Sequence, residues 1–124
     1  MIIVDASAFV DLLLGFANAP AVEEELRAHP DDLHVPHLVD LEVMSALRRF
    51  QAREPLSDFL VLPMQRYPHT LLFPRIWELR DNFSAYDGVY VALAEGLEAP
   101  LLTSDKSLAR ATRKHTGVEV LLAA

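Results

Sequence analysis

Short apolar segments that end at an acidic residue constrain the fold of this chain more than any other feature. The β-branched run Ile2 to Val4 is followed by Asp5, and the run Pro100 to Ser104 is followed by Asp105. Continuous apolar runs of this kind are typical of strands that are buried on both faces of a parallel sheet. Both aspartates are therefore expected just beyond the carboxyl ends of strands, at the edge where open parallel sheets bind ligands.

Strand-like and helix-like segments alternate along the chain. Further strands are predicted at Leu33 to Pro36, Gln65 to Tyr67, Leu101 to Thr103 and Val118 to Leu122. Helices are predicted at Ser7 to Leu14, Pro20 to Ala28, His37 to Arg53, Pro74 to Asn82, Ser84 to Ala99 and Asp105 to His115, and a short apolar turn at Leu56 to Leu62. This alternation predicts an α/β fold with a parallel sheet and right-handed crossovers. A chain of 124 residues is enough for one such domain.

The composition excludes several classes of function. The absence of cysteine rules out thiol catalysis and zinc–thiolate sites, and it suits a reducing compartment. A net charge of −7 is unfavourable for a protein that binds nucleic acid by charge alone. The longest uncharged run, Leu12 to Val22, is much shorter than the roughly 20 residues that cross a bilayer, and no signal peptide is recognisable. We expect a cytoplasmic protein that does not contact membranes.

The aspartates have simple structural explanations when each is taken alone. Aspartate is a favoured helix N-cap, so Asp5 and Asp105 are each expected to cap the helix that follows. Asp87 lies three residues after Ser84, which is the spacing of a capping box. Capping alone therefore accounts locally for each of these three aspartates.

Glu42 is less easily explained, because apolar residues surround it in the predicted helix His37 to Arg53. An ion pair with Arg49, two turns further along, is one explanation and stays open at this point. The fold class offers another, since parallel strand ends that are distant in sequence meet at one edge of the sheet. Glu42 would then join the aspartates there.

Four converging carboxylates would need a cation. Two unit charges about 4 Å apart repel by roughly 4 kcal/mol at an effective dielectric of about 20. Such a cluster must take up protons or bind cations, and ligands that are all oxygen suit Mg²⁺ or Mn²⁺. A metal ion there activates water and neutralises a phosphate, so hydrolysis of a phosphodiester is the favoured reaction. The residues concerned are Asp5, Glu42, Asp87 and Asp105.

Basic side chains form two groups that are candidates for binding the phosphates of RNA. They are Arg48, Arg49 and Arg53, and Arg110, Arg113 and Lys114. For each residue, a solvent-exposed helix face is an equally good explanation.

Several segments together resemble a known family. They are Ile3 to Ala8, Pro36 to Val43, Arg66 to His69, Tyr86 to Ala94 and Leu102 to Asp105. Over nearly its whole length the chain resembles the PIN-domain ribonucleases, and within them the VapC-type toxins of bacterial toxin–antitoxin pairs. The resemblance implies a three-layer α/β/α sandwich with a short, mostly parallel central sheet.

The resemblance also implies roles for particular residues and partners. Asp5, Glu42, Asp87 and Asp105 would form the catalytic acidic quartet that binds Mg²⁺ or Mn²⁺, with Asp5 and Asp87 as direct ligands and with the hydroxyls of Ser7 and Thr103 in support. The family cleaves RNA endonucleolytically and usually forms homodimers. A cognate VapB-type antitoxin blocks the site with its C-terminal segment, and contact with DNA occurs only through the antitoxin.

The chain departs from the family pattern at Pro55 to Asp58. Relatives usually carry a longer helical stretch before this point, so either this chain has a deletion or the sequence lacks a segment. The departure affects the helical clamp that shapes access to the site.

Three alternatives remain at this stage. They are a receiver-like signalling domain, a catalytically inactive PIN-like binding module, and an aspartyl-phosphate phosphatase. The phosphatase would need a second aspartate two residues after Asp5, where Ser7 stands.

Overall fold

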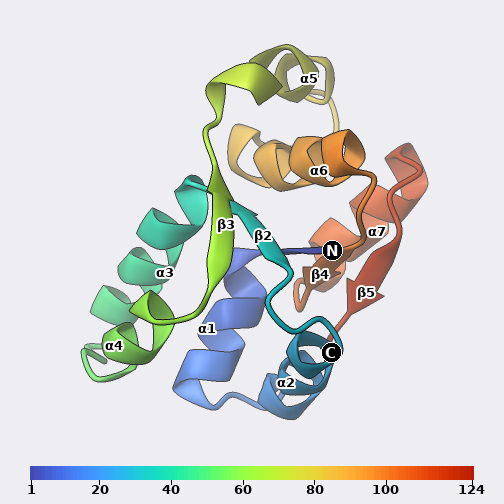
Figure 1. The fold of residues 1–124 in the computed structure, drawn as a ribbon. Helices are drawn as coiled ribbons and strands as arrows, with labels where there is room; N and C mark the ends of the chain where they lie inside the picture. The colour runs from blue at the N-terminus through green and yellow to red at the C-terminus, as the bar shows by residue number, and fades with distance from the viewer.

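A computed structural model of the chain describes residues 1–124 and contains one five-stranded sheet between two layers of helices (Figure 1). The strands lie in the order β3-β2-β1-β4-β5, and every neighbouring pair is parallel. Their bounds are β1 (Ile2–Val4), β2 (Leu33–Pro36), β3 (Met64–Tyr67), β4 (Leu101–Thr103) and β5 (Val120–Leu122). The predicted α/β/α sandwich is therefore confirmed, and its sheet is parallel throughout.

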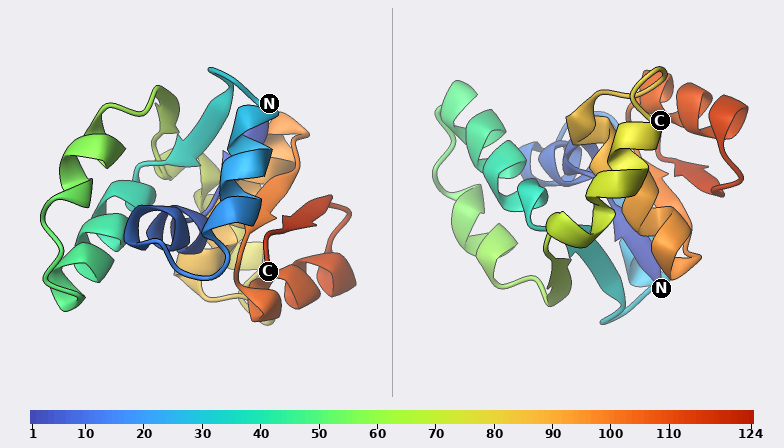
Figure 2. Two further views of the ribbon diagram at one scale, coloured as in Figure 1. Left: turned by 90° about the horizontal axis from the view of Figure 1, so that it is seen from below. Right: turned by 90° about the horizontal axis from the view of Figure 1, so that it is seen from above.

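Seven α-helices and one short 3-10 helix cover the two faces of the sheet. They are α1 (Ala6–Leu14), α2 (Ala19–Arg27), α3 (Leu38–Arg49), α4 (Pro55–Leu60), η1 (Thr70–Leu72), α5 (Phe73–Glu78), α6 (Ala85–Leu97) and α7 (Lys106–His115). Helices α1 to α4 lie on one side of the sheet, and α5 to α7 lie on the other (Figures 1 and 2). No helix is long and apolar enough to pass through a bilayer.

The order in which strands are added to the sheet changes direction at the first strand. From β1 it moves outward through β2 to β3, and it then returns to add β4 and β5 on the other side of β1. The helices that follow β1 and β4 consequently leave toward opposite faces of the sheet, and in open α/β sheets ligands bind at the carboxyl ends of two such strands. Asp5 comes directly after β1, and Asp105 comes two residues after the end of β4.

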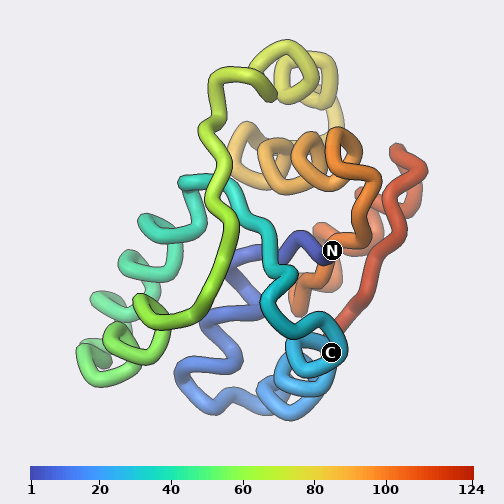
Figure 3. The backbone as a smooth tube through the Cα atoms, in the orientation of Figure 1, coloured from blue at the N-terminus to red at the C-terminus, as the bar shows by residue number.

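The helix predicted to run from His37 to Arg53 is shorter in the structure. It ends at Arg49, and Gln51 adopts a left-handed conformation with φ of 53° that turns the chain out of the helix. Arg53 therefore lies in the connection between α3 and α4 rather than on the helix. Figure 3 shows this connection at the lower left. The sequence offered no glycine or proline at this turn, which explains why the end was predicted too late.

The segment predicted as an apolar turn over Leu56 to Leu62 is largely the helix α4. Phe59 anchors this helix, because its side chain is 1% exposed and its ring meets that of Phe9 in α1 edge-to-face, with centroids 5.4 Å apart. Proline at the first position of α4 suits the start of a helix. The region that departs from the family pattern is thus a short helix packed on α1.

The remaining helix and strand boundaries differ from the prediction by a few residues. The largest difference is in α5, which ends at Glu78 instead of Asn82. Helical spacing in the predicted helix Ser84 to Ala99 indicates one apolar stripe, made of Tyr86, Val89, Tyr90, Leu93, Ala94 and Leu97. Tyr86 does not belong to it, because its side chain is 64% exposed. The others lie in the core or at its margin, between α6 and strands β1 and β2.

Candidate active site

Asp5 lies at the centre of the carboxyl edge and is 4% exposed. It caps α1 by accepting the amide hydrogen of Ala8 at 3.1 Å, as capping predicts. The same oxygen, Oδ1, accepts from the hydroxyl of Ser7 at 2.7 Å, and Oδ2 accepts from the hydroxyl of Thr103 at 2.6 Å. Burial raises the pKa of Asp5 to about 6 even though these hydrogen bonds favour the charged form. Asp5 therefore combines an N-cap with a carboxylate that is costly to ionise.

Asp105 caps α7 in the predicted way. Its Oδ1 accepts the amide hydrogens of Ser107 at 2.9 Å and Leu108 at 3.1 Å. Its own amide donates to the hydroxyl of Thr103 at 3.0 Å. Because Thr103 also donates to Asp5, one hydroxyl connects the two strand ends.

Asp87 lies in the first turn of α6, and its carboxylate is uncommitted. Ser84 caps the helix by accepting the amide hydrogen of Asp87 at 3.1 Å, which is one half of the predicted capping box. The carboxylate itself has neither a hydrogen bond nor an ion pair. Partial burial and the charge of Asp105 raise the pKa of Asp87. This carboxylate is therefore available to an external ligand.

Glu42 has a partner other than Arg49. Its Oε1 accepts a hydrogen bond of 2.7 Å from the hydroxyl of Tyr90 in α6. Arg49 lies instead over the ring of Phe50, with 5.9 Å between the guanidinium carbon and the ring centre. Desolvation, opposed by the Tyr90 hydroxyl and reinforced by the charge of Asp87, raises the pKa of Glu42. The ion pair with Arg49 that the helical spacing allowed is not formed.

The four carboxylates are close enough to repel one another. Asp105 raises the pKa of both Asp5 and Asp87, and Asp87 raises that of Glu42. As the side chains lie, no set of three or more histidine, cysteine, aspartate or glutamate residues is close enough to hold a metal ion directly. This arrangement fits a hard cation that keeps several of its waters and binds through one or two carboxylates. The donors are all oxygen, which also suits Mg²⁺ or Mn²⁺.

Three positioning contacts near the site were not predicted from the sequence. Tyr90 was assigned to the apolar stripe without a polar role. At the start of α3, the amide of Leu38 donates to Nε2 of His69 at 2.8 Å. Arg66 of β3 donates to both oxygens of Asp40 at 2.8 Å and 2.9 Å. Their partners are 26 to 48 residues apart in sequence, so no local pattern indicates them.

The two predicted basic groups lie in different surroundings. Arg48 and Arg53 border an apolar groove beyond the end of α3 that also contains Met44 and Leu56. Arg110, Arg113 and Lys114 border a groove along α7. The two groups therefore do not form one basic surface.

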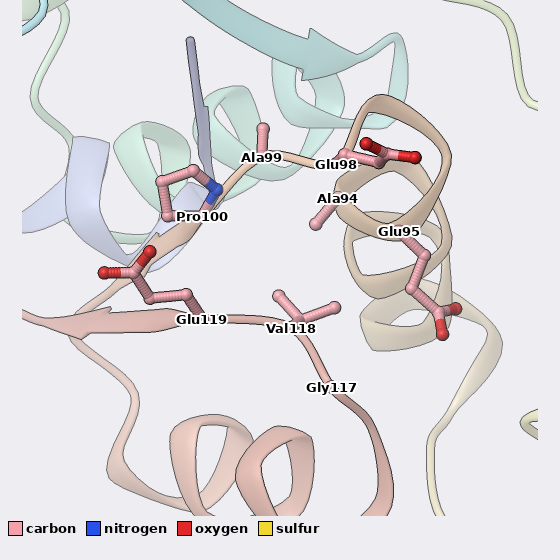
Figure 4. A pocket seen from close by; sticks show the side chains of 8 residues that line it. All are labelled: Ala94, Glu95, Glu98, Ala99, Pro100, Gly117, Val118 and Glu119. Carbon is pink, nitrogen blue, oxygen red and sulfur yellow. The ribbon is translucent and has the colours of Figure 1, made fainter.

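A separate hollow lies at the opposite edge of the sheet (Figure 4). It is lined by the end of α6 and by the chain entering β4 and β5, with Glu95, Glu98 and Glu119 among its residues. Glu95 is already paired with Arg75 at 2.8 Å. The hollow is remote from the carboxyl ends of the strands and from the four carboxylates.

The fold and the carboxylates at the switch point of the sheet define the class of the protein. The family model described as PIN domain matches residues 2–114, so the chain belongs to the PIN-domain family. This confirms the resemblance noted in the sequence and excludes a receiver-like domain.

Within this family the chain belongs to the VapC ribonucleases. It is 45% identical to ribonuclease VapC9 of Mycobacterium tuberculosis, with 87% of this chain and 88% of the relative covered. It is 38% identical to ribonuclease VapC12 of the same species, with 98% and 99% covered.

Solved structures support the fold independently. The VapC20 toxin of Mycobacterium tuberculosis, which is described as cleaving the sarcin-ricin loop, superimposes with a TM-score of 0.76 at 17% identity over 90% of this chain and 95% of that one. A toxin–antitoxin complex from Klebsiella pneumoniae matches with a TM-score of 0.75 at 17% identity, covering 100% of this chain and 98% of that chain.

Proposed function

We propose that this protein is a Mg²⁺- or Mn²⁺-dependent endoribonuclease that acts as the toxin of a VapBC-type toxin–antitoxin pair. The observation that carries the proposal is the position of Asp5, a carboxylate that is 4% exposed at the carboxyl edge and has no cationic partner. Burial and the charge of Asp105 accordingly raise its pKa. A carboxylate in this position is stabilised in its charged form by a bound cation. We infer RNA as the substrate because the relatives VapC9 and VapC12 are ribonucleases.

The side chains of the site have separate tasks in this proposal. A bound metal ion would supply Lewis acidity toward the phosphate and a water of lowered pKa. Asp5 and Asp87 would hold the ion, and Glu42 and Asp105 would accept hydrogen bonds from its waters. Thr103 and Ser7 hold the carboxylate of Asp5 in place through hydrogen bonds of 2.6 Å and 2.7 Å.

A protein partner is supported by the apolar surface beside the site. On α3, Leu41 is 72% exposed and Met44 is 36% exposed, and the groove bordered by Met44, Leu47 and Leu56 continues this surface. Exposed apolar groups that adjoin one another are typical of protein interaction sites. We assign this surface to a VapB-type antitoxin.

A homodimer is supported by a second apolar surface, on α5. Phe73 is 59% exposed and Trp77 is 67% exposed, and both border a hollow that includes Ile76. Exposed aromatic residues are enriched in protein interfaces. Light scattering after size exclusion tests this assignment, since the variant Trp77→Ser should elute later and scatter as a smaller species than the unchanged protein.

Cleavage of RNA by the purified chain tests the proposed activity. Single-stranded RNA should be cut with Mg²⁺ or Mn²⁺ and left intact with EDTA. Asp5→Asn should abolish cleavage and keep the circular dichroism of the folded protein, whereas Asp81→Asn, which alters an exposed carboxylate without hydrogen bonds, should cut normally. Metal-dependent cleavage by Asp5→Asn would refute the proposal. Binding of Mn²⁺ without any cleavage by the unchanged protein would favour an inactive binding module.

A further inference from the structure

Helix α7 presents a continuous basic surface that we call the α7 groove. Lys106, Arg110, Arg113 and Lys114 line it together with Leu122 of β5, and it encloses about 520 Å³. The chain has only two lysines, and both are here. Helix α7 has no acidic residue, although the whole chain carries a net charge of −7.

The cations of the α7 groove have no acidic partners. None of the ion pairs in the structure involves them, and Arg113 alone has a polar contact, donating to the carbonyl of Val120 at 3.1 Å. Other arginines are paired, such as Arg66 with Asp40 and Arg75 with Glu95. The positive charge of the groove is therefore available to an external anion.

Stabilisation of the helix explains only part of this charge. Arg113 and Lys114 lie in the last turn, where cations interact favourably with the helix dipole. Lys106 is the first residue of the helix, where a cation is unfavourable, and Arg110 lies in the middle. The helix dipole therefore does not explain the charges of Lys106 and Arg110.

The α7 groove adjoins the candidate active site. Lys106 directly follows Asp105, and Leu122 pairs in register with Thr103, whose hydroxyl binds Asp5. Neighbouring strands are about 4.8 Å apart, so the wall of the groove is one strand away from the site. From there the groove follows α7 from Lys106 to Lys114, which is about 12 Å at about 1.5 Å per residue.

The other basic group lacks this placement. Arg48 and Arg49 are in the last turn of α3, roughly 10 Å along the helix from Glu42 at about 1.5 Å per residue. Arg48 and Arg53 border an apolar groove, and Arg49 contacts a phenylalanine ring. Of the two groups, only the one on α7 begins at the carboxylates.

We infer that the α7 groove binds the sugar–phosphate backbone of single-stranded RNA beside the scissile bond, an inference that rests on the proposed function. The four cations contact phosphates and not bases, so they position the strand without selecting its sequence. Lys106 is added to the predicted RNA-binding residues, and Arg48, Arg49 and Arg53 are not part of this surface.

Binding measurements on uncut RNA test the groove without relying on cleavage. The affinity for a labelled single-stranded RNA would be measured by fluorescence anisotropy at several salt concentrations, with Asp5→Asn present in every variant to prevent cleavage. Adding Arg110→Gln and Lys114→Gln should reduce the slope of log affinity against log salt by about 1.4, because each lost phosphate contact on a single strand contributes about 0.7. A control variant, Arg27→Gln, removes an exposed positive charge elsewhere on the surface and should leave the slope unchanged.

Cleavage by the otherwise unchanged protein provides the second measurement. With Arg110→Gln and Lys114→Gln, KM should rise while kcat stays near its original value, since the substituted groups do not touch the reacting atoms. If the double variant kept the salt slope of the unchanged groove, the inference would be overturned. It would also be overturned if the double variant lost binding to polyglutamate but kept binding to RNA, because the groove would then bind an acidic protein. A reduced slope in a protein that never cuts RNA would support the groove and refute the proposed activity.

Discussion

The hydroxyl of Tyr90 donates a 2.7 Å hydrogen bond to the carboxylate of Glu42, and this contact joins α6 to α3 beside the candidate active site. Both helices begin at the carboxyl edge, and each brings one acid, Asp87 or Glu42, to it. The hydrogen bond favours the charged form of Glu42 and opposes the effects of burial and of Asp87 on its pKa.

Tyr90→Phe should therefore raise the pKa of Glu42 further and weaken metal binding near neutral pH. The acidic limb of the dependence of kcat/KM on pH should move to higher pH, and the free energy of unfolding should fall by about 1 kcal/mol for the lost hydrogen bond. Tyr86→Phe is the matched control, because Tyr86 is exposed and has no hydrogen bond through its hydroxyl. Identical pH profiles for the two variants would contradict this role of Tyr90.

Asp5→Asn should stabilise the metal-free protein at neutral pH. The pKa of Asp5 is raised from 3.8 to about 6, so its contribution to stability is present below the lower value and is lost as the pH rises through the higher one. That loss corresponds to about 3 kcal/mol at about 1.4 kcal/mol per pH unit. Asparagine avoids the loss and can still accept the amide hydrogen of Ala8 through its oxygen. Its amide nitrogen cannot accept from Thr103, and the loss of that hydrogen bond offsets about 1 kcal/mol of the gain.

Urea unfolding in EDTA measures this effect of Asp5→Asn. The variant should exceed the unchanged protein in free energy of unfolding above about pH 6 and lose that advantage toward about pH 4. The opposite outcome, a variant that is less stable by the same amount at both pH values, would mean that the charge of Asp5 is not the source of the cost.

Metal binding should release protons in mildly acidic solution. Burial and mutual repulsion raise the pKa values of Asp5, Glu42 and Asp87, and the ion requires their charged forms. The affinity for Mn²⁺ should consequently increase as the pH rises through about 6. Calorimetry in two buffers of different ionisation enthalpy counts the protons.

The acidic hollow of Figure 4 provides the control for this titration. Glu119→Gln removes one of its carboxylates and should leave the affinity and the proton release unchanged, whereas Asp87→Asn should reduce both. If Glu119→Gln weakened binding instead, the measured metal site would be the hollow.

Phe59→Ala should reveal how the short helix α4 is held. The side chain of Phe59 is 1% exposed and packs edge-to-face on Phe9, so its removal leaves a cavity that costs about 3 to 5 kcal/mol. Leu60→Ala, at a neighbouring side chain that is 63% exposed, should change the free energy of unfolding by less than about 0.5 kcal/mol. Chemical denaturation compares the two, and equal effects would show that α4 does not depend on this contact.

The sequence by itself determined the alternating fold and the location of the aspartates. Two apolar runs are too short for anything but buried strands. One ends just before Asp5 and the other ends at Thr103, shortly before Asp105, so the local pattern assigns both acids to one edge of the sheet. Capping was equally predictable, because an N-cap bond reaches only two or three residues along the chain.

Only the tertiary structure decided which groups surround those acids. Tyr90 is 48 residues from Glu42, and Thr103 is 98 residues from Asp5, so helical or strand periodicity carries no information about either contact. The raised pKa of Asp5 likewise comes from burial by segments distant in sequence. Local patterns specify strands and caps because their hydrogen bonds are local, whereas the ionisation of a carboxylate depends on everything the fold packs around it.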